Sequence, residues 1–223
     1  MPEAVPVVAV DGPAASGKGT IAERVATVLG YRYLDSGALY RLVALKALRS
    51  GADIDDPVAL AALARGLDAT FAGGRLGLDG EDVTEAVRDE AVSAAASRVA
   101  VHAPVRTALL ERQRAFRVPP GLVADGRDMG TVVFPDATVK VFVTASADER
   151  ARRRHRQLAQ RGIDVNIQSL LHDIHERDAR DGSRAVAPLV AAADAAVVDT
   201  TELTIDAAVE AVLARARAAG LAA

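Results

Sequence analysis

Hydrophobic residues occur along the chain in short runs that alternate with amphipathic stretches. The run at 6–10 (PVVAV) is continuously apolar and rich in β-branched residues, which is typical of a buried parallel strand. After a glycine-rich segment, the apolar positions take a helical spacing from Thr20 that ends at Gly30. A second short apolar run at 31–34 precedes a helical stretch at about 38–49. This order of strand, loop, helix and strand predicts an α/β fold with a parallel sheet.

The pattern changes in the middle of the chain. Residues 67–83 alternate apolar and polar positions around two glycine-containing turns, AGGR and LDG, which predicts two or three short antiparallel strands. Such strands do not belong to a parallel sheet, so they indicate a small inserted lobe. A helix is expected before this region at 58–64, and two helices are expected after it at 85–101 and 105–117. The last part of the chain returns to the α/β pattern, with strands expected at 122–125, 139–143 and 196–199 and helices at 147–161, 167–180 and 205–219.

The composition is that of one sizeable globular domain, or of one domain that carries an insert. The chain has 223 residues, of which 50% are hydrophobic and 26% charged, so it can bury enough surface to offset the entropy of ordering. No apolar run reaches the ~18 residues of a membrane span, and the N-terminus lacks the basic segment of a signal peptide. The absence of cysteine excludes disulfides and thiolate metal sites. We therefore expect a cytoplasmic protein that does not bind membranes.

The charges point to small anions rather than to nucleic acid. The formal net charge is -3, which argues against an extended nucleic-acid groove. The 27 basic residues comprise 24 arginines and three lysines, a bias that we attribute mainly to a GC-rich genome. That bias does not explain where each arginine lies, so we expect the functional arginines to converge on a small anion.

The segment GPAASGKGT matches the phosphate-binding loop pattern G-x-x-x-x-G-K between a predicted strand and a predicted helix. The glycines let successive N–H groups point at phosphate oxygens, the helix N-terminus adds positive potential, and Lys18 reaches the β- and γ-phosphates. A glycine-rich turn without a ligand is the alternative. The candidate ATP-binding residues are Gly12, Pro13, Ala14, Ala15, Ser16, Gly17, Lys18, Gly19 and Thr20.

The loop departs from the usual pattern at Gly19, where many such loops carry a magnesium-binding serine or threonine. Ser16 or Thr20 can take that role, or Mg²⁺ is held mainly through water. Asp125 ends the apolar run LVAD and is the candidate carboxylate for orienting a magnesium-bound water, with a helix or turn cap as the alternative. We expect Mg²⁺ to act with ATP, through Thr20 and, by way of water, Asp125.

Three isolated arginines occur in loop-like or helix-end contexts, Arg41 in LYR, Arg127 in DGRD and Arg184 in GSR. Their planar forks suit bidentate phosphate binding better than lysine does. An enzyme that phosphorylates a monophosphate must bring two anionic groups together and exclude water, so it needs several such cations. Surface ion pairs with neighbouring aspartates are the alternative for each arginine.

Several motifs, taken together, resemble the bacterial cytidylate kinases of the longer type. They are DGPAASGKGT, DSGALYR (35–41), DGRDMGTVVFPDA (125–137) and ERDARDGSRAVAPL (176–189), and the resemblance extends from Val7 to about Asp199. It implies transfer of the γ-phosphoryl group of ATP to CMP or dCMP, with Mg²⁺. It also implies a three-layer P-loop NTPase fold, a core at about 1–55 and 101–223, an inserted monophosphate-binding lobe at about 56–100 and a helical lid at about 150–162.

The resemblance also implies a set of CMP-binding residues. In the family, the positions that match Arg41, Arg127 and Arg184 hold the acceptor phosphate. Ser97, Arg106 and Asp128 match the base-reading positions, and Asp128 would face the amino group of cytosine but repel O4 of uracil. The full set is Ser36, Tyr40, Arg41, Ser97, Arg106, Arg127, Asp128, Arg177, Asp181 and Arg184.

Some members of this set have simpler interpretations. Ser97 can be a small packing residue in an alanine-rich helix, and Tyr40 can be ordinary packing. Arg177 and Asp181, which match ribose-binding positions, are four residues apart and can form a helical ion pair.

The densest positive segment is ERARRRHR, at 149–156. By the resemblance, Arg153 and Arg154 match lid positions that fold over the ATP phosphates. The alternatives are that this segment is a solvated helix face or that it binds nucleic acid. The expected catalytic residues are Lys18, Arg127, Arg153, Arg154 and Arg184.

We therefore expect a monomeric enzyme whose partners are ATP and CMP or dCMP, without nucleic acid. Two alternatives stay open at this point. Another P-loop kinase, for UMP, AMP or shikimate, would keep the phosphate-binding residues, and a non-enzymatic nucleotide-binding module would need only the loop and the basic segment.

Overall fold

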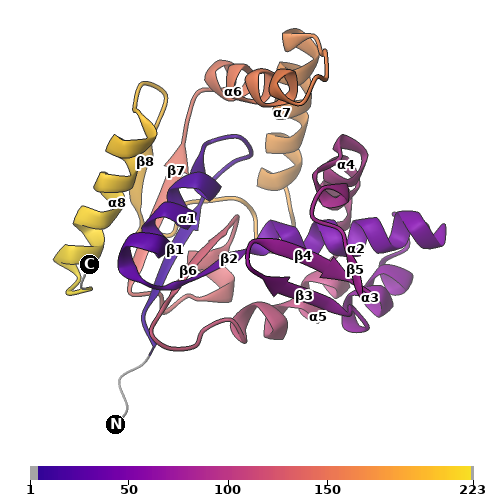
Figure 1. Cartoon of the computed structure of the whole chain (residues 1–223), viewed down its shortest axis with the longest axis horizontal. Coiled ribbons are helices and arrows are strands. Elements are labelled where there is room, and N and C mark those ends of the chain that lie inside the picture. The colour runs from indigo at the N-terminus through magenta and orange to yellow at the C-terminus, as the bar shows by residue number, and fades with distance from the viewer. Residues whose placement is uncertain (1–4, 222–223) are drawn as a thin grey trace. The chain divides into compact units, whose positions relative to one another are not determined.

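The computed structural model describes residues 5–221, which form two compact units (Figure 1). The larger unit contains the chain up to Leu34 and from Phe116 onward, and the smaller unit is Asp35–Ala115. Within residues 5–221, no helix is both long enough and apolar enough to cross a bilayer.

A five-stranded sheet forms the centre of the larger unit, in the order β2-β6-β1-β7-β8. The strands are β1 (Val7–Asp11), β2 (Arg32–Asp35), β6 (Leu122–Gly126), β7 (Val139–Thr144) and β8 (Ala196–Asp199). β1 pairs in parallel with β6 on one side and with β7 on the other, and β7 pairs in parallel with β8. The predicted α/β class with a central parallel sheet is thus confirmed.

β1 occupies the middle of the sheet, and all five of its residues are buried there. Helices α1 (Lys18–Leu29) and α8 (Ile205–Ala218) pack against each other and against this sheet. Apolar residues from both helices and from three strands fill the interface, among them Ile21, Val141 and Val212. Gly30, with φ 66°, ends α1 in the left-handed conformation, as the sequence predicts.

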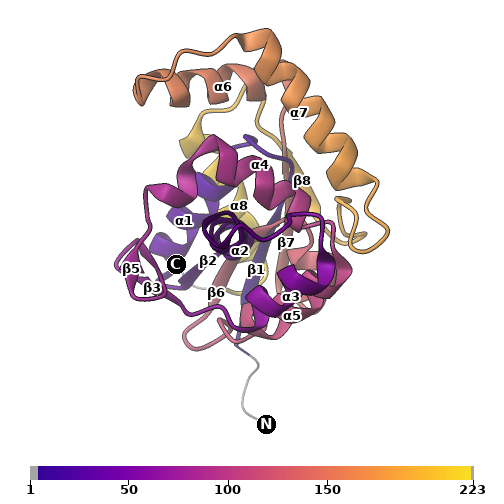
Figure 2. The same ribbon diagram turned by 90° about the vertical axis from the view of Figure 1, so that its right-hand side faces the viewer.

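Helices α6 (Ala147–Gln160) and α7 (Ile167–Gly182) lie side by side in the larger unit, as Figures 1 and 2 both show. Ala151, Leu158, Leu170 and Ile174 form a small apolar cluster between them. The side chains of Ser146 and Asn166 cap the two helices by accepting hydrogen bonds from N–H groups of the first turn. The two helices therefore form a helical hairpin with its own core.

The smaller unit combines helices with a second sheet. Its helices are α2 (Ser36–Ser50), α3 (Pro57–Arg65), α4 (Glu90–Val99) and α5 (Ala103–Arg114), with one 3₁₀ turn, η1 (Ala86–Arg88). The sheet contains β3 (Ala69–Ala72), β4 (Arg75–Leu78) and β5 (Glu81–Asp82), paired antiparallel in that order. This confirms the short antiparallel strands expected at 67–83.

Two helix boundaries differ from the prediction. The helix expected at 85–101 is divided, because Asp89 adopts an extended conformation (φ -65°, ψ 144°) between η1 and α4. Asp89 is therefore the residue before α4, which begins at Glu90. The helix expected at 105–117 begins earlier, at Ala103 with a proline in its first turn, and ends at Arg114.

A buried carboxylate joins the central strand to a turn that the sequence pattern does not predict. The turn is η2 (Met129–Val133), a single π-helical turn with hydrogen bonds from Val133 N–H to Asp128 C=O (3.1 Å) and from Phe134 N–H to Met129 C=O (2.7 Å). Asp11, the last residue of β1, accepts hydrogen bonds from Met129 N–H and Gly130 N–H, both at 2.8 Å.

The surroundings of Asp11 disfavour its charged form. Burial raises the pKa of Asp11 to about 6, although the hydrogen bonds from Gly130 and Met129 and the nearby charge of Lys18 act in the opposite direction. The neighbouring carboxylate of Asp128 adds to the increase. Ionised Asp11 is thus less favourable in the folded protein than in the unfolded chain.

This pKa predicts a pH-dependent stability difference between the protein and its Asp11→Asn variant. The unfolded carboxyl ionises near 3.8 and the folded one near 6, so stability relative to the variant is highest below about pH 4 and falls as the pH rises to about 6. The fall is about 3 kcal/mol at most. Urea unfolding of both proteins between pH 4 and pH 7 measures it, and a difference that does not change with pH would contradict the prediction.

Candidate phosphate-binding and acceptor-binding residues

The glycine-rich segment forms a loop between β1 and α1, and its backbone conformation requires glycine at two positions. Gly12 has φ 154°, and a Cβ atom there would lie 2.0 Å from the carbonyl oxygen of Val143. Gly17 has φ 89° and directly precedes α1, which begins at Lys18. The positive end of the α1 dipole therefore faces the loop, and Lys18 is the first residue of that helix.

The interior of the loop holds a polar group that lacks a protein partner. The Oγ atom of Ser16 is buried and makes no hydrogen bond within residues 5–221. Ala15 beside it has φ 58°, which is uncommon for a residue with a side chain. A buried hydroxyl without a partner costs free energy, and backbone strain is typical of ligand-binding loops. Both features favour a loop shaped for a ligand over a turn without one.

Asp125 lies beside Lys18 and explains the glycine at position 19. Asp125 belongs to β6, and its side chain is buried. The Oδ1 atom lies 3.9 Å from Lys18 Nζ, and Oδ2 accepts a hydrogen bond from the Tyr33 hydroxyl at 3.3 Å. A Cβ atom on Gly19 would lie 2.9 Å from Asp125 Oδ2. Any side chain at position 19 would therefore displace the carboxylate. Asp125 is part of a strand and not a helix cap, whereas Thr20 is exposed in the first turn of α1.

Asp181 holds two of the predicted arginines in the larger unit. The carboxylate is 1% exposed, accepts a hydrogen bond from Arg127 Nε at 2.9 Å, and pairs with Arg184 Nη2 through its other oxygen. Burial by itself would raise the pKa of Asp181, but the guanidinium charges of Arg127, Arg184 and Arg177 overcome it and hold the pKa below its ordinary value. Asp181 is thus the buried centre of an arginine cluster to which Arg177 also contributes charge.

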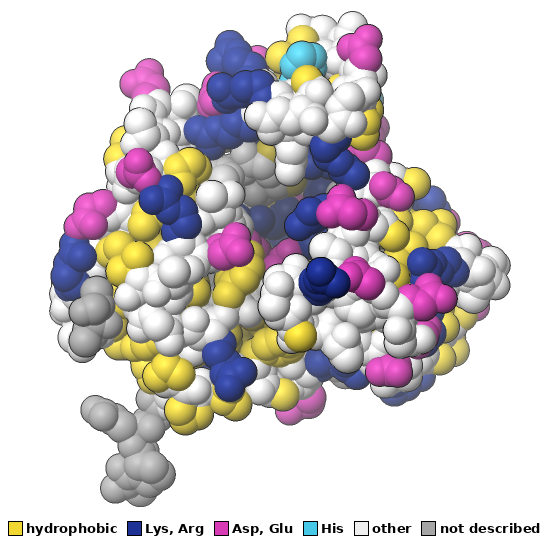
Figure 3. All heavy atoms as spheres, viewed as in Figure 1, with side chains coloured by type: hydrophobic (Ala, Val, Ile, Leu, Met, Phe, Trp, Pro, Cys, Tyr) yellow, Lys and Arg dark blue, Asp and Glu magenta, His cyan; other side chains and the backbone are white. Residues whose placement is uncertain are grey.

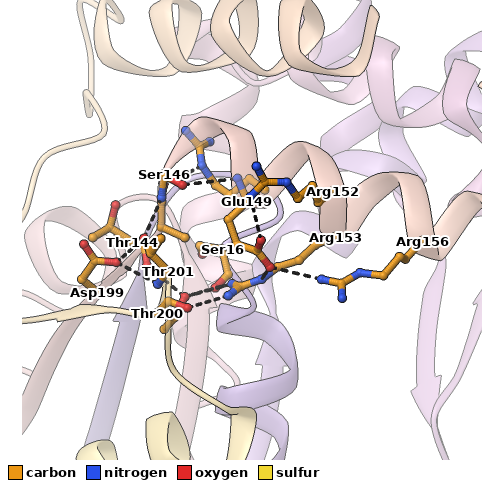
Figure 4. A network of polar contacts seen from close by, with 12 residues as sticks. Ser16, Thr144, Ser146, Glu149, Arg152, Arg153, Arg156, Asp199, Thr200 and Thr201 are labelled. Atoms are coloured by element: carbon orange, nitrogen blue, oxygen red, sulfur yellow. Dashed lines mark hydrogen bonds and ion pairs between the residues drawn. The ribbon is translucent and has the colours of Figure 1, made fainter. Parts of the chain in front are cut away.

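Arg153 is bound to the phosphate-binding loop through a network of polar contacts (Figure 4). Its Nη1 atom donates to the carbonyl oxygen of Ser16 at 3.1 Å and to Thr200 Oγ1 at 2.9 Å, and its Nη2 donates to the Thr200 carbonyl at 2.5 Å. Thr200 is buried, and its hydroxyl also lies 3.0 Å from the carbonyl oxygens of Ser16 and Thr144. Glu149 accepts a hydrogen bond from Arg153 Nε at 3.1 Å.

Arg150 is a second buried contact to the loop, and the sequence analysis did not identify it. It is 5% exposed and forms a bidentate pair with Asp178 of α7, with N–O distances of 3.0 and 2.6 Å. Its Nη1 also donates to the Ala14 carbonyl at 3.4 Å, and its Nε to Ala145 at 3.0 Å. Arg150 lies in a segment with four other arginines, and nothing in the amino-acid sequence distinguishes it as the buried one.

The remaining basic residues of α6 have different surroundings. Figure 3 shows Lys and Arg side chains gathered over this helix. Arg152 and Arg156 are 63% and 66% exposed in their side chains and pair with Glu149, and Arg154 donates to Gln157 at 2.7 Å. The predicted lid arginines therefore differ, because Arg153 contacts the loop backbone and Arg154 has a contact along its own helix.

In the smaller unit, Arg41 pairs with Asp35 at 2.6 Å. The same carboxylate caps α2 by accepting a hydrogen bond from Ala38 N–H at 3.1 Å, which fixes it at the start of the helix. Ser36 is buried beside it in the first turn. Arg41 thus forms the ion pair with a neighbouring aspartate that was the alternative to phosphate binding. The pair involves the Nη2 atom of its guanidinium.

Arg106 and Tyr40 also meet in the smaller unit. The guanidinium carbon of Arg106 lies 5.8 Å from the centre of the Tyr40 ring, and its Nη1 donates to the Ala100 carbonyl at 3.3 Å. Both side chains are buried, as is Ser97 on α4, which packs against α2. A buried arginine is rare unless its charge has a function or a partner.

The structure thus distributes the predicted residues over both units. The larger unit contains the loop, Asp128 and the arginine cluster of Asp181, and the smaller unit contains Ser36, Tyr40, Arg41, Ser97 and Arg106. Asp11, Glu149, Arg150 and Thr200 are polar residues near the loop that the sequence analysis did not select. Of these, Asp11 had a usable signal, because an acidic residue directly follows a buried strand.

A solved structure of distant sequence supports the fold. A gluconokinase from Sinorhizobium meliloti 1021 aligns with 96% of this chain and 94% of its own, at 18% identity and a TM-score of 0.50. At this identity the similarity concerns the fold alone.

Sequence comparisons identify much nearer relatives. Proteins named cytidylate kinase from Burkholderia vietnamiensis and Burkholderia thailandensis are each 59% identical over 215 residues, which cover 96% of this chain and 94% of theirs. The family model described as cytidylate kinase matches residues 8–218. The match includes the phosphate-binding loop, both units and the arginine cluster of Asp181, and the chain belongs to the cytidylate kinase family.

Proposed function

We propose that this protein is an ATP-dependent cytidylate kinase that transfers the γ-phosphoryl group of ATP to CMP or dCMP, giving ADP and CDP or dCDP. The observation that carries the proposal is the buried cluster of Arg127, Arg184 and Asp181 in the same unit as a phosphate-binding loop, in a chain that belongs to this family. Two phosphate-binding elements are what transfer between two phosphorylated molecules requires.

ATP is bound by residues 12–20 in this proposal. Loop N–H groups and the N-terminus of α1 hold the phosphates, and Lys18 adds a compact charge near the β- and γ-phosphates. Arg153 keeps the loop in shape through the Ser16 carbonyl, and Arg154 is the arginine of 150–162 that contacts the transferred group. Residues 150–162 act as the lid, whose closure excludes water.

The donor atoms near Lys18 fit a magnesium ion bound together with ATP. Mg²⁺ prefers oxygen ligands and keeps several waters, so one buried carboxylate and a hydroxyl are sufficient alongside the phosphates. Asp125 would hold it through water, with Thr20 or the buried hydroxyl of Ser16 as further ligands. The ion would neutralise charge on the phosphates during transfer.

The proposed CMP-binding residues are those that match the CMP-binding positions of the family. Arg41, Arg127 and Arg184 bind the acceptor phosphate, and Arg177 and Asp181 bind the ribose hydroxyls. Asp128, Arg106 and Ser97 read the cytosine edge, and Ser36 and Tyr40 also belong to the CMP-binding set. Residues 56–100 form the monophosphate-binding lobe, and the enzyme is a cytoplasmic monomer.

The arrangement requires no dedicated catalytic base. An oxygen of the CMP phosphate is already largely ionised near neutral pH, so it needs orientation rather than deprotonation. Fixed guanidinium groups lower the repulsion between the two substrates, and they require no reorganisation because Asp181 already holds two of them. The chain's contribution is therefore to position phosphates, to supply positive charge and to exclude water.

The first test is a comparison of phosphoryl acceptors. ADP formation is measured with CMP, dCMP, UMP, AMP and shikimate under identical conditions. We expect CMP and dCMP to give the highest kcat/KM, because the acceptor O4 of uracil opposes a carboxylate. Faster turnover of AMP than of CMP would contradict the base-reading residues, and no turnover with any acceptor would contradict a kinase.

Asp128→Ala tests the base-reading carboxylate. We expect the ratio of kcat/KM for CMP to that for UMP to fall by about 10- to 100-fold, with a smaller change in kcat at saturating CMP. Asp136→Ala is a matched control, because it removes an exposed aspartate of the same segment that pairs with Arg117. An unchanged ratio in Asp128→Ala would count against this role.

Arg153→Ala and Arg154→Ala separate the two lid arginines. Arg153→Ala removes one hydrogen-bond donor from the Ser16 carbonyl and one from the Thr200 carbonyl, so we expect a loss of about 2 kcal/mol in stability and a higher KM for ATP. Arg154→Ala should lower kcat by about tenfold or more with little change in stability. Thermal unfolding and steady-state kinetics measure both effects, with the exposed Arg215→Ala as control. Equal effects on stability would refute the distinction.

A further inference from the structure

The single π-helical turn η2 begins directly after Asp128, the residue proposed to read cytosine. The first N–H groups of such a turn need an acceptor, and the preceding residue usually supplies it from its own side chain. In the described part of the chain, the Asp128 side chain makes no such capping hydrogen bond to η2. Asp11 caps the turn instead, with one carboxylate oxygen on Met129 N–H and the other on Gly130 N–H, both at 2.8 Å.

Asp11 itself belongs to the central strand of the larger unit. As the last residue of β1, it is paired on one side with Gly126 of β6 and on the other with Phe142 of β7. The next residue is Gly12, the first of the phosphate-binding loop, which is packed against the Val143 carbonyl. One residue therefore connects the start of the ATP-binding loop, through its backbone, to the turn that follows Asp128, through its side chain.

The contact leaves little space for an alternative arrangement. Asp11 is 6% exposed, and a Cβ atom on Gly130 would lie 3.4 Å from Asp11 Oδ2 and 3.2 Å from the Lys140 side chain. The carboxylate and the turn are thus in close contact on a backbone fixed by two neighbouring strands. A side chain held in this way orients what is attached to it to within fractions of an ångström.

We propose that Asp11 is a positioning residue for acceptor recognition, which holds η2 so that Asp128 meets the cytosine base in the productive orientation. The inference rests on the proposed function, because it assumes that Asp128 reads the base of CMP. It assigns to Asp11 a role in the choice of acceptor and not in the binding of ATP, although Asp11 is next to the ATP-binding loop in the sequence.

Asp11→Asn tests the role with a minimal change of shape. An asparagine side chain has one acceptor oxygen, so either Met129 N–H or Gly130 N–H faces an NH₂ group and the turn must shift. We expect the KM for CMP to rise and the CMP/UMP ratio of kcat/KM to fall, each by about tenfold, as is typical when a supporting residue misplaces a substrate-binding group. The KM for ATP should change by less than about threefold, because the β1 backbone keeps its partners on both sides.

Two control variants separate positioning from general destabilisation. Val209→Ala creates a cavity in the core between α8 and the sheet, and it should lower stability without changing the CMP/UMP ratio. Asp136→Asn makes the same chemical change on an exposed aspartate, and it should leave the stability and the CMP/UMP ratio of kcat/KM unchanged. A folded Asp11→Asn protein with the KM for CMP and the CMP/UMP ratio of the unmodified enzyme would overturn the proposal.

A measurement on the unmodified protein covers the case in which Asp11→Asn does not fold. CMP is added to ¹⁵N-labelled protein without ATP, and the amide signals of Met129 and Gly130 are followed, with UMP as comparison. We expect both signals to shift more with CMP than with UMP. Binding of CMP that leaves both signals unchanged would overturn the role of Asp11, whereas absence of both CMP binding and CMP turnover would be a failure of the proposed function.

Discussion

A loop that turns its N–H groups toward a ligand directs carbonyl groups into the protein, and those carbonyls need donors. Here the carbonyl of Ser16 accepts hydrogen bonds from Arg153 and from the Thr200 hydroxyl, and the carbonyl of Ala14 accepts one from Arg150. The elements that supply these donors are the start of α6 and the residue after β8. The shape of the phosphate-binding loop therefore depends on segments more than a hundred residues away in the sequence.

This requirement distinguishes two arginines of α6 from the other arginines of the helix. Arg150 and Arg153 use their donors on loop carbonyls and on the acidic partners Asp178 and Glu149, so they act as parts of the scaffold. Arg152 and Arg156 extend into solvent. A guanidinium suits the first task because its planar fork can serve a carbonyl and a carboxylate simultaneously, which a lysine ammonium does less well. The abundance of arginine therefore has structural as well as compositional consequences.

The sequence predicted the strands, most helices and the loop because these depend on local periodicity and on glycine spacing. It did not predict η2, whose hydrogen bonds to the carboxylate of Asp11 join residues more than a hundred positions apart and leave no local signal at 129–133. It identified the departure at Gly19 but not its cause, because the neighbouring carboxylate of Asp125 comes from a strand about a hundred residues later. The pairing of Arg127 with Asp181 could not be predicted for the same reason, although each residue was predicted separately to bind CMP.

The charge balance of the Asp181 cluster shows how a protein can keep arginines ready for a phosphate. Unpaired guanidinium groups so close together would repel each other and lose hydration, which is costly when they are buried. One carboxylate between Arg127 and Arg184 fixes both and removes only part of their charge, so the cluster keeps a net positive charge. The charge of Arg177 adds to this positive potential, because it also lowers the pKa of Asp181. One buried carboxylate among three guanidinium groups therefore fixes two of them and leaves a positive charge that attracts a phosphate.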